Sequence, residues 1–356
     1  MWHKAFIPSG KPDGTPILSV LAKKSYTIAP GAVTECDEYV PLVENDVFAE
    51  PDNPLYSDVV AENDHIPFKP FTDVVVTGKA YAPRGKRAYH LDVGIAVGQL
   101  KKTIRVFGER TVESRALRGL QITAPQPFTE MTLGYRRAYG GIARDKKGTL
   151  MTFYPNPIGT GFALKGGFEE ASQLRVPNIE DPAAPVTTDN LVLDDFEKWP
   201  EAPKPASLGW TRRNFYPRYT YAGVLPEYLA AAEKNRDEMA KKYPQLANAP
   251  MPKMDFRVYQ GASDGLWGGP LKGNEPVRLT YLDPDNPTFD FQLPGETPLI
   301  TLDTGEGAKQ LPAVLQTVFI NKEKNLLSLV WRGCVEYGGV ETLAQVRKLE
   351  FDVAKA

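Results

Sequence analysis

The sequence is poor in the residues that build disulfides and metal sites. Two cysteines occur among 356 residues, Cys36 and Cys334, far apart and outside any CxxC spacing. The three histidines, His3, His65 and His90, form neither an HExxH motif nor a cluster with cysteine. The sequence therefore predicts no disulfide framework, no metal site and no cofactor.

A basic surface and long apolar runs are missing as well. The formal net charge is −2 and the Lys and Arg residues form no long run, so the electrostatic footprint of nucleic-acid binding is absent. Nowhere do about 18 apolar residues follow one another, and the first residues lack the apolar core of a signal peptide. We expect a cytoplasmic protein without a nucleic-acid or membrane partner.

What the sequence does contain is the alternation of β-strands. Between Asp73 and Arg110, apolar residues recur at every second position, as in a strand with one buried face: Leu91, Val93, Ile95 and Val97, then Ile104 and Val106. Gly98-Gln99 separates the two runs and suits a tight hairpin turn. Residues 313–320 and 326–333, joined by the polar turn NKEKN, predict a second hairpin. We expect a mainly β, sandwich-like fold of antiparallel sheets.

Proline and glycine divide the rest into short segments. The 32 Pro and 30 Gly predict long ordered loops. Within residues 125–210 we expect aromatic side chains to pack these loops against the rest of the protein: Phe128, Tyr135, Phe153, Tyr154 and Phe162. One amphipathic helix is expected near 226–243, with Pro226 in its first turn. We divide the chain into an N-terminal strand and loop segment (1–64), a β domain (65–335) and a C-terminal strand extension (336–356).

The sequence predicts no catalytic residue. A GxSxG elbow is absent, and Gly159 and Gly161 of NPIGTG spell no phosphate-binding loop, so turn glycines are the better interpretation. The neighbouring carboxylates Asp194-Asp195 favour a solvated acidic loop over a glycosidase pair. His90 and Asp92 share one strand face, where the carboxylate orients the imidazole or belongs to a cross-strand polar pair; both remain open.

Three aromatic residues in a Gly-rich segment, FRVYQGASDGLWGGPL, are a different kind of signal. Phe256, Tyr259 and Trp267 either fill the core of the protein itself or anchor a protein partner. We keep them as candidate partner-binding residues.

Eight blocks of the sequence, taken in order, resemble one known family. They are KPFTDVVVTGKAYAP, LGYRRAYGG, NPIGTGF, LRVPNIEDP, GWTRRNFYPR, MDFRVYQGASD, GNEPVRLTYLDPDNPTFDFQLPG and LLSLVWRG, and they cover roughly residues 65–335. The chain resembles the domain-of-unknown-function family encoded beside type VI secretion spike and toxin genes. It departs from the family pattern at Tyr139, where phenylalanine is usual.

The resemblance implies a non-enzymatic role. Members act as adaptors or chaperones that hold a toxin effector, often one with a PAAR tip domain, and help to load it onto the VgrG spike. The partners implied here are a cognate toxin effector and VgrG. Four positions typical of the family sequence pattern join the candidate partner-binding residues: Tyr139, Asn156, Gly159 and Gly161. The alternative is that they serve only in the core or in turns. Two other functions stay open: a carbohydrate-active hydrolase on a β scaffold and a structural subunit of the secretion apparatus.

Overall fold

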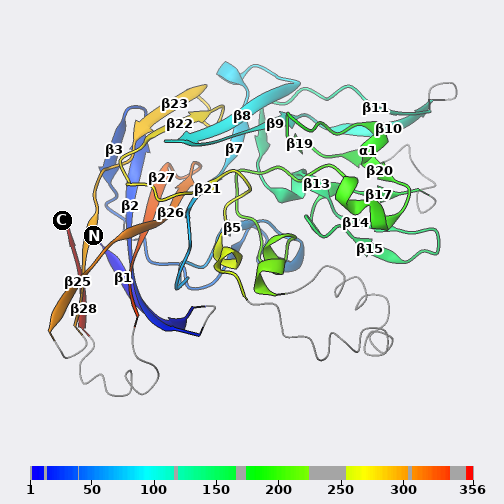
Figure 1. The fold of residues 1–356 in the computed structure, drawn as a ribbon. Helices are drawn as coiled ribbons and strands as arrows, with labels where there is room; N and C mark the ends of the chain where they lie inside the picture. The colour runs from blue at the N-terminus through cyan, green and yellow to red at the C-terminus, as the bar shows by residue number, and fades with distance from the viewer. Residues whose placement is uncertain are drawn as a thin grey trace, which may run out of the picture.

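The computed structural model describes residues 2–11, 14–38, 40–115, 119–165, 174–223, 254–303, 307–336 and 350–355. Within these residues the fold is mainly β, as the alternation predicts (Figure 1). The amphipathic helix expected near 226–243 lies outside the described residues, as does most of the segment 336–356. No helix in the described part of the chain is long and apolar enough to cross a membrane.

The largest sheet joins the two ends of the sequence. In order across the sheet it contains β1 (His3–Gly10), β2 (Pro16–Ala29), β27 (Leu326–Glu336), β26 (Val314–Asn321), β6 (Thr72–Thr77) and β21 (Trp267–Gly268), and β3 (Ala32–Glu35) also pairs with β2. β26 and β27 form the second predicted hairpin. β6 runs parallel to β26, so the sheet is mixed rather than wholly antiparallel. Because β2 pairs with β27, the N-terminal segment 1–64 and the β domain 65–335 contribute strands to the same sheet.

The second sheet carries the first predicted hairpin and is antiparallel throughout. Its order is β19 (Ile179–Glu180), β9 (Leu100–Phe107), β8 (His90–Val97), β22 (Pro276–Thr280) and β23 (Thr288–Gln292). Val97 pairs with Leu100 across a two-residue turn in which Gly98 has a φ of 55°. The left-handed region favours glycine, so the sequence fixes where this strand reverses.

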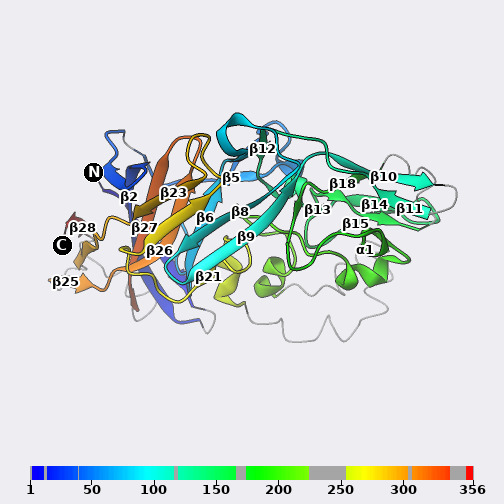
Figure 2. The ribbon, with the colours of Figure 1, turned by 90° about the horizontal axis from the view of Figure 1, so that it is seen from above.

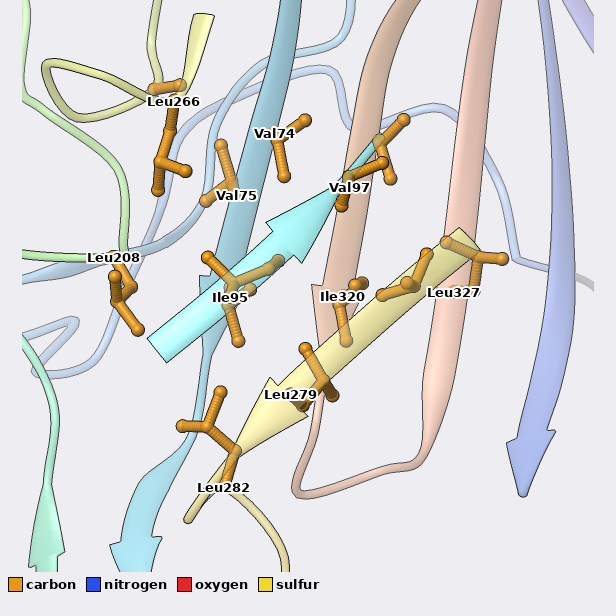
Figure 3. Close-up of a cluster of buried hydrophobic side chains, with 14 of the residues drawn as sticks. Val74, Val75, Ile95, Val97, Leu208, Leu266, Leu279, Leu282, Ile320 and Leu327 are labelled. Atoms are coloured by element: carbon orange, nitrogen blue, oxygen red, sulfur yellow. The ribbon is translucent and has the colours of Figure 1, made fainter. Parts of the chain in front are cut away.

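The two sheets pack face to face around the main hydrophobic core, which confirms the sandwich. Figure 3 shows β8 and β22 crossing over β6, β26 and β27, with Ile95, Val97 and Leu279 facing Val74, Ile320 and Leu327. All six side chains are buried, because each strand turns alternate residues toward the other sheet.

A second, smaller core lies at the other end of the elongated molecule, seen from above in Figure 2. Tyr139, Phe153 and Phe162 pack there in edge-to-face and tilted pairs. The prediction that the five aromatic residues of the 125–210 loops pack into the protein is therefore confirmed, since all five are buried. Short elements surround this core: β10 (Arg110–Arg115), β11 (Gly119–Ile122), β13 (Tyr139–Gly140), β14 (Ile142–Arg144), β15 (Leu150–Thr152), β16 (Thr160–Gly161), β17 (Ala163–Leu164), β18 (Arg175–Val176), α1 (Thr188–Leu191), β20 (Val192–Leu193) and the 3₁₀ turn η5 (Phe196–Glu201).

The remaining elements are short pairs and 3₁₀ turns. The strands are β4 (Val47–Phe48) with β5 (Val59–Ala61), β7 (Lys79–Tyr81) with β12 (Glu130–Thr132), and β24 (Pro298–Asp303) with β25 (Ala308–Leu311) and β28 (Glu350–Lys355). The 3₁₀ turns are η1 (Pro54–Tyr56), η2 (Pro83–Gly85), η3 (Tyr135–Arg137), η6 (Arg218–Ala222) and η7 (Phe256–Tyr259).

His3 gives the first strand a pH-dependent attachment. Its Nδ1 accepts a hydrogen bond from the backbone N–H of Leu42 at 2.9 Å. Burial lowers the pKa of His3 below 6.5, and the nearby Lys23 and His65 act in the same direction, whereas Asp64 and Glu44 oppose it.

We predict that His3→Asn reduces the acid sensitivity of the fold. A histidine whose pKa is lowered on folding stabilises the protein fully above its unfolded pKa, and this contribution is lost as pH falls through the lower, folded value. Asparagine keeps an acceptor but does not titrate. The melting temperature of His3→Asn should therefore fall less between about pH 7.5 and 5.5 than that of the wild type, where the unfolded histidine titrates. Equal falls in calorimetry would contradict the role of His3.

Candidate functional site

A groove of about 430 Å³ lies where the two cores meet. Phe153 and Ala202 in its lining belong to the smaller core, whereas Ala262 and Trp267 belong to or pack against the larger one. We call it the aromatic groove, because aromatic and proline residues dominate its lining: Tyr135, Phe153, Pro155, Trp199, Pro200, Pro203, Pro205, Tyr216, Pro217, Tyr221 and Trp267. Boundaries between packed units are common places for binding sites.

One wall of the aromatic groove is built on η5. The carboxylate of Asp195 accepts a hydrogen bond from the backbone N–H of Glu197 at 3.1 Å and so caps the start of this turn. The turn presents Trp199, whose ring meets Tyr216 edge to face, with centroids 4.9 Å apart. A second edge contact, to Tyr154 at 5.6 Å, fixes the indole from the core side. The ring is thus held in place while it remains half-buried and lines the groove.

The floor of the groove is held by a buried charge network. Gln260 donates from its Nε2 to Oδ1 of Asp73 at 2.6 Å. The other oxygen of Asp73 pairs with Nζ of Lys69 at 2.6 Å and accepts the backbone N–H of Gly261 at 2.8 Å. Asp73, on β6, is fully buried. The sandwich therefore fixes the segment that follows η7.

Arg218 links the two 3₁₀ turns η6 and η7 on the opposite side of the groove. This buried side chain on η6 donates from Nε to the carbonyl of Val258 on η7 at 2.8 Å, and its Nη2 lies 2.6 Å from a carboxylate oxygen of Glu62. The two turns lie side by side, drawn in light green and yellow-green in Figure 1. Nearby, the hydroxyl of Tyr135 is hydrogen-bonded to Thr211 at 2.7 Å, and burial raises the pKa of Tyr135. The lining is thus rigidly supported.

The groove holds little that could ligate a metal. Asp264 is the carboxylate among its described lining residues, and Lys204 and Arg257 are its exposed cations. The ranges that the structure describes contain no group of three or more His, Cys, Asp or Glu side chains placed to hold a metal ion.

A second pocket, of about 450 Å³, is polar and its charges are paired internally. Arg136 pairs with Glu50, and Arg175 pairs with Glu109 at 2.7 Å. Burial raises the pKa of Asp58, although its carboxylate accepts the backbone N–H of Tyr135 at 2.6 Å. The contacts of Tyr135 and Arg136 anchor η3, and Thr160 of the NPIGTG loop donates to the carbonyl of Arg136 at 2.8 Å.

The structure places the three candidate aromatics at different depths. Trp267 lines the aromatic groove and packs against Phe71, with ring centroids 5.3 Å apart. Phe256 is 9% exposed and stacks on Phe68 at 4.9 Å. Tyr259 is half-buried beside Phe256, 5.8 Å away. Of the three, Trp267 is the one that reaches the groove.

Asn156 and Tyr139 face inward. Asn156 is 0% exposed and donates from Nδ2 to the carbonyls of Tyr135 at 2.7 Å and Tyr139 at 3.0 Å. Tyr139 is 1% exposed and donates to the carbonyl of Leu191 at 3.0 Å. Both side chains hold the loop together, and neither reaches the surface of this structure.

The two glycines of the NPIGTG loop have backbone reasons to be glycine. A Cβ on Gly159 would lie 2.7 Å from the carbonyl oxygen of Ala138, closer than real contacts allow. Gly161 has a φ of 98°, which strains other residues. Gly159 also lines the polar pocket, so a partner can reach it there.

The other residues considered at the sequence level have structural partners. Asp92 forms its cross-strand pair with Arg105, at 2.7 and 2.8 Å, while His90 lies against the ring of Phe107. Asp194 pairs with Lys165 and Lys198, which hold its pKa at about 2. Both cysteines are free. Cys334 is half-buried and directly follows the buried residues of β27.

Sequence reasoning missed Trp199, Tyr216 and Tyr221 as groove residues. Their signal was present in the composition: residues 199–221 combine four prolines with six aromatic residues. This density is unusual for a plain loop, because it provides apolar surface without a periodic pattern.

The model of a family described as an uncharacterized protein conserved in bacteria (DUF2169) matches residues 13–332, and the chain belongs to this family. No curated protein and no solved structure matches the chain.

Proposed function

We propose that the protein is a non-enzymatic adaptor or chaperone. It binds a type VI secretion toxin effector, helps to load it onto the VgrG/PAAR spike, and contacts this cargo through the aromatic groove. The observation that carries the proposal is the groove itself, where half-buried tryptophan and tyrosine rings line a rigidly supported floor between two cores. The resemblance of eight sequence blocks to the type VI-associated family supports the choice of cargo.

The chemistry of the groove suits protein binding. Tryptophan and tyrosine are the residues that most often dominate binding energy in protein interfaces. Because Trp199 and the floor around Gln260 are fixed in the free protein, little conformational entropy is lost when a partner binds. Asp264 has no second carboxylate beside it in the described lining, so the hydrolase alternative finds no paired acids here.

We predict that the toxin encoded beside this gene depends on the protein for its soluble amount. An adaptor that binds the folded cargo shifts it toward the competent state by mass action, so deletion of the gene should lower the soluble toxin. Quantitative immunoblotting of the toxin, with an unrelated secreted tube component as reference, measures this. Wild-type protein should restore the toxin, and Trp199→Ala should not.

Tyr89→Ala is the matched control. Tyr89 is 60% exposed and lies outside the groove lining, so its loss removes an aromatic ring without touching the proposed contact. It should restore the toxin fully. Normal toxin levels in the deletion strain would exclude the adaptor function, and loss of the tube component as well would favour a structural subunit.

A further inference from the structure

We infer that the aromatic groove binds an extended, proline-rich segment of its partner. The inference rests on the proposed function only for the statement that the segment belongs to the toxin. The chemical match between the groove and a proline-rich peptide is argued from the lining residues alone. Segments of this kind adopt the polyproline II conformation, which is extended and needs no internal hydrogen bonds.

Neighbouring aromatic rings form the surface that such a segment would contact. Trp199 and Tyr216 pack edge to face against each other at an interplanar angle of 77°, and both rings line the groove. Tyr221 continues the lining, with the guanidinium of Arg257 4.4 Å from its ring centre. Domains that recognise polyproline II segments dock them into grooves lined by aromatic rings.

Hydrogen-bonding capacity points to the same ligand. Tyr216 and Tyr221 offer phenol O–H groups, Trp199 an indole N–H and Lys204 an ammonium, and none of these groups has a hydrogen-bond partner among the described residues. Proline keeps its carbonyl acceptor but has no N–H donor. A proline-rich segment therefore supplies the acceptors that these donors lack.

The side chains of Trp199, Lys204 and Arg257 can only donate, and the hydroxyls of Tyr216 and Tyr221 can donate or accept, so donors outnumber acceptors among these groups. The amide oxygen of Gln260 already accepts the backbone N–H of Phe71 at 3.2 Å, and the hydroxyl of Thr211 is bonded to Tyr135. Asp264 remains as the charged acceptor of the lining. An extended segment without proline would bring an N–H group at every residue, and each N–H that faces the groove and finds no acceptor costs free energy. This asymmetry selects against segments without proline.

The experiment titrates a proline decamer into the purified full-length protein and follows intrinsic tryptophan fluorescence and heat. We expect saturable binding with a Kd of about 0.1–1 mM, typical of a short peptide held by aromatic contacts and few hydrogen bonds. A glycine-serine decamer should produce no signal. Trp199→Ala should abolish binding of the proline decamer.

Tyr216→Phe keeps the test independent of folding. It removes only the phenol oxygen, so the ring contacts and the melting temperature should remain. Binding should weaken about threefold to tenfold, as expected for one lost hydrogen bond. Tyr89→Phe, the same change outside the groove, should have no effect.

The outcomes separate this inference from the proposed function. No binding of the proline decamer, or binding that ignores both Trp199→Ala and Tyr216→Phe, overturns the inference. If the decamer fails while toxin rescue still needs Trp199, the adaptor function stands and the proline-rich ligand is wrong. If the decamer binds but the soluble amount of toxin does not depend on the protein, the proline-rich ligand stands and the adaptor function is wrong. Self-association that Trp199→Ala abolishes, without decamer binding, would assign the groove to a second copy of the chain.

Discussion

Asp73→Ala should lower the free energy of unfolding by about 3–5 kcal/mol, as expected when one partner of a buried ion pair is removed. Asp73 is fully buried, and its two oxygens serve Lys69, Gln260 and Gly261. Alanine leaves the ammonium of Lys69 inside the protein without its counter-ion. It also leaves the Gln260 amide and the Gly261 N–H without acceptors, and an unsatisfied buried donor costs more than the bond itself contributed.

Urea unfolding measures this effect, with an exposed ion pair as the control. Asp92 pairs with Arg105 on the surface of the second sheet, so Asp92→Ala should cost at most about 1 kcal/mol. The double variant Lys69→Met/Asp73→Leu removes both charges and should be more stable than Asp73→Ala. If Asp73→Ala costs no more than Asp92→Ala, the buried network does not support the groove.

The hairpins could be predicted because their information is local. Leu91 to Val97 alternate between two faces, and Gly98 reverses the chain within two residues. Neither feature depends on distant residues. The parallel pairing of β6 with β26 is different, because about 240 residues separate the partners Asp73 and Thr317 along the chain. Which strand pairs with β6 depends on how the whole core packs, and the hydrophobic periodicity of the sequence carries no information about this pairing.

The aromatic groove shows the same limit for a site. Trp199 on η5, Tyr216 just before η6 and Trp267 on β21 come from separate segments that meet because two cores pack side by side. Trp267 could be recognised from the sequence as an aromatic residue in a Gly-rich segment. Its neighbours could not be assigned to it, since a contact between loops leaves no spacing rule in the sequence.

Asn156→Asp should be the most informative change in the NPIGTG loop. The substitution preserves the shape of the side chain but replaces the amide, which donates to the carbonyls of Tyr135 and Tyr139, by a carboxyl group. A carboxylate at this fully buried position would face carbonyl oxygens. We expect a loss of about 3 kcal/mol or more at neutral pH, combining lost hydrogen bonds with the burial of charge.

The pH dependence of Asn156→Asp distinguishes buried charge from simple loss of packing. Burial and the facing carbonyls disfavour the carboxylate, so the pKa of the new side chain is raised on folding. A raised folded pKa means that stability is lost as pH rises through the unfolded and then the folded value, so the deficit relative to wild type should shrink on acidification from about pH 7 to 5. The exposed change Asn214→Asp should stay within about 0.5 kcal/mol at both pH values. A stability deficit that is independent of pH would mean that Asn156 acts through shape alone. A variant as stable as the wild type would mean that the hydrogen bonds of Asn156 do not hold the loop that joins the smaller core to the groove.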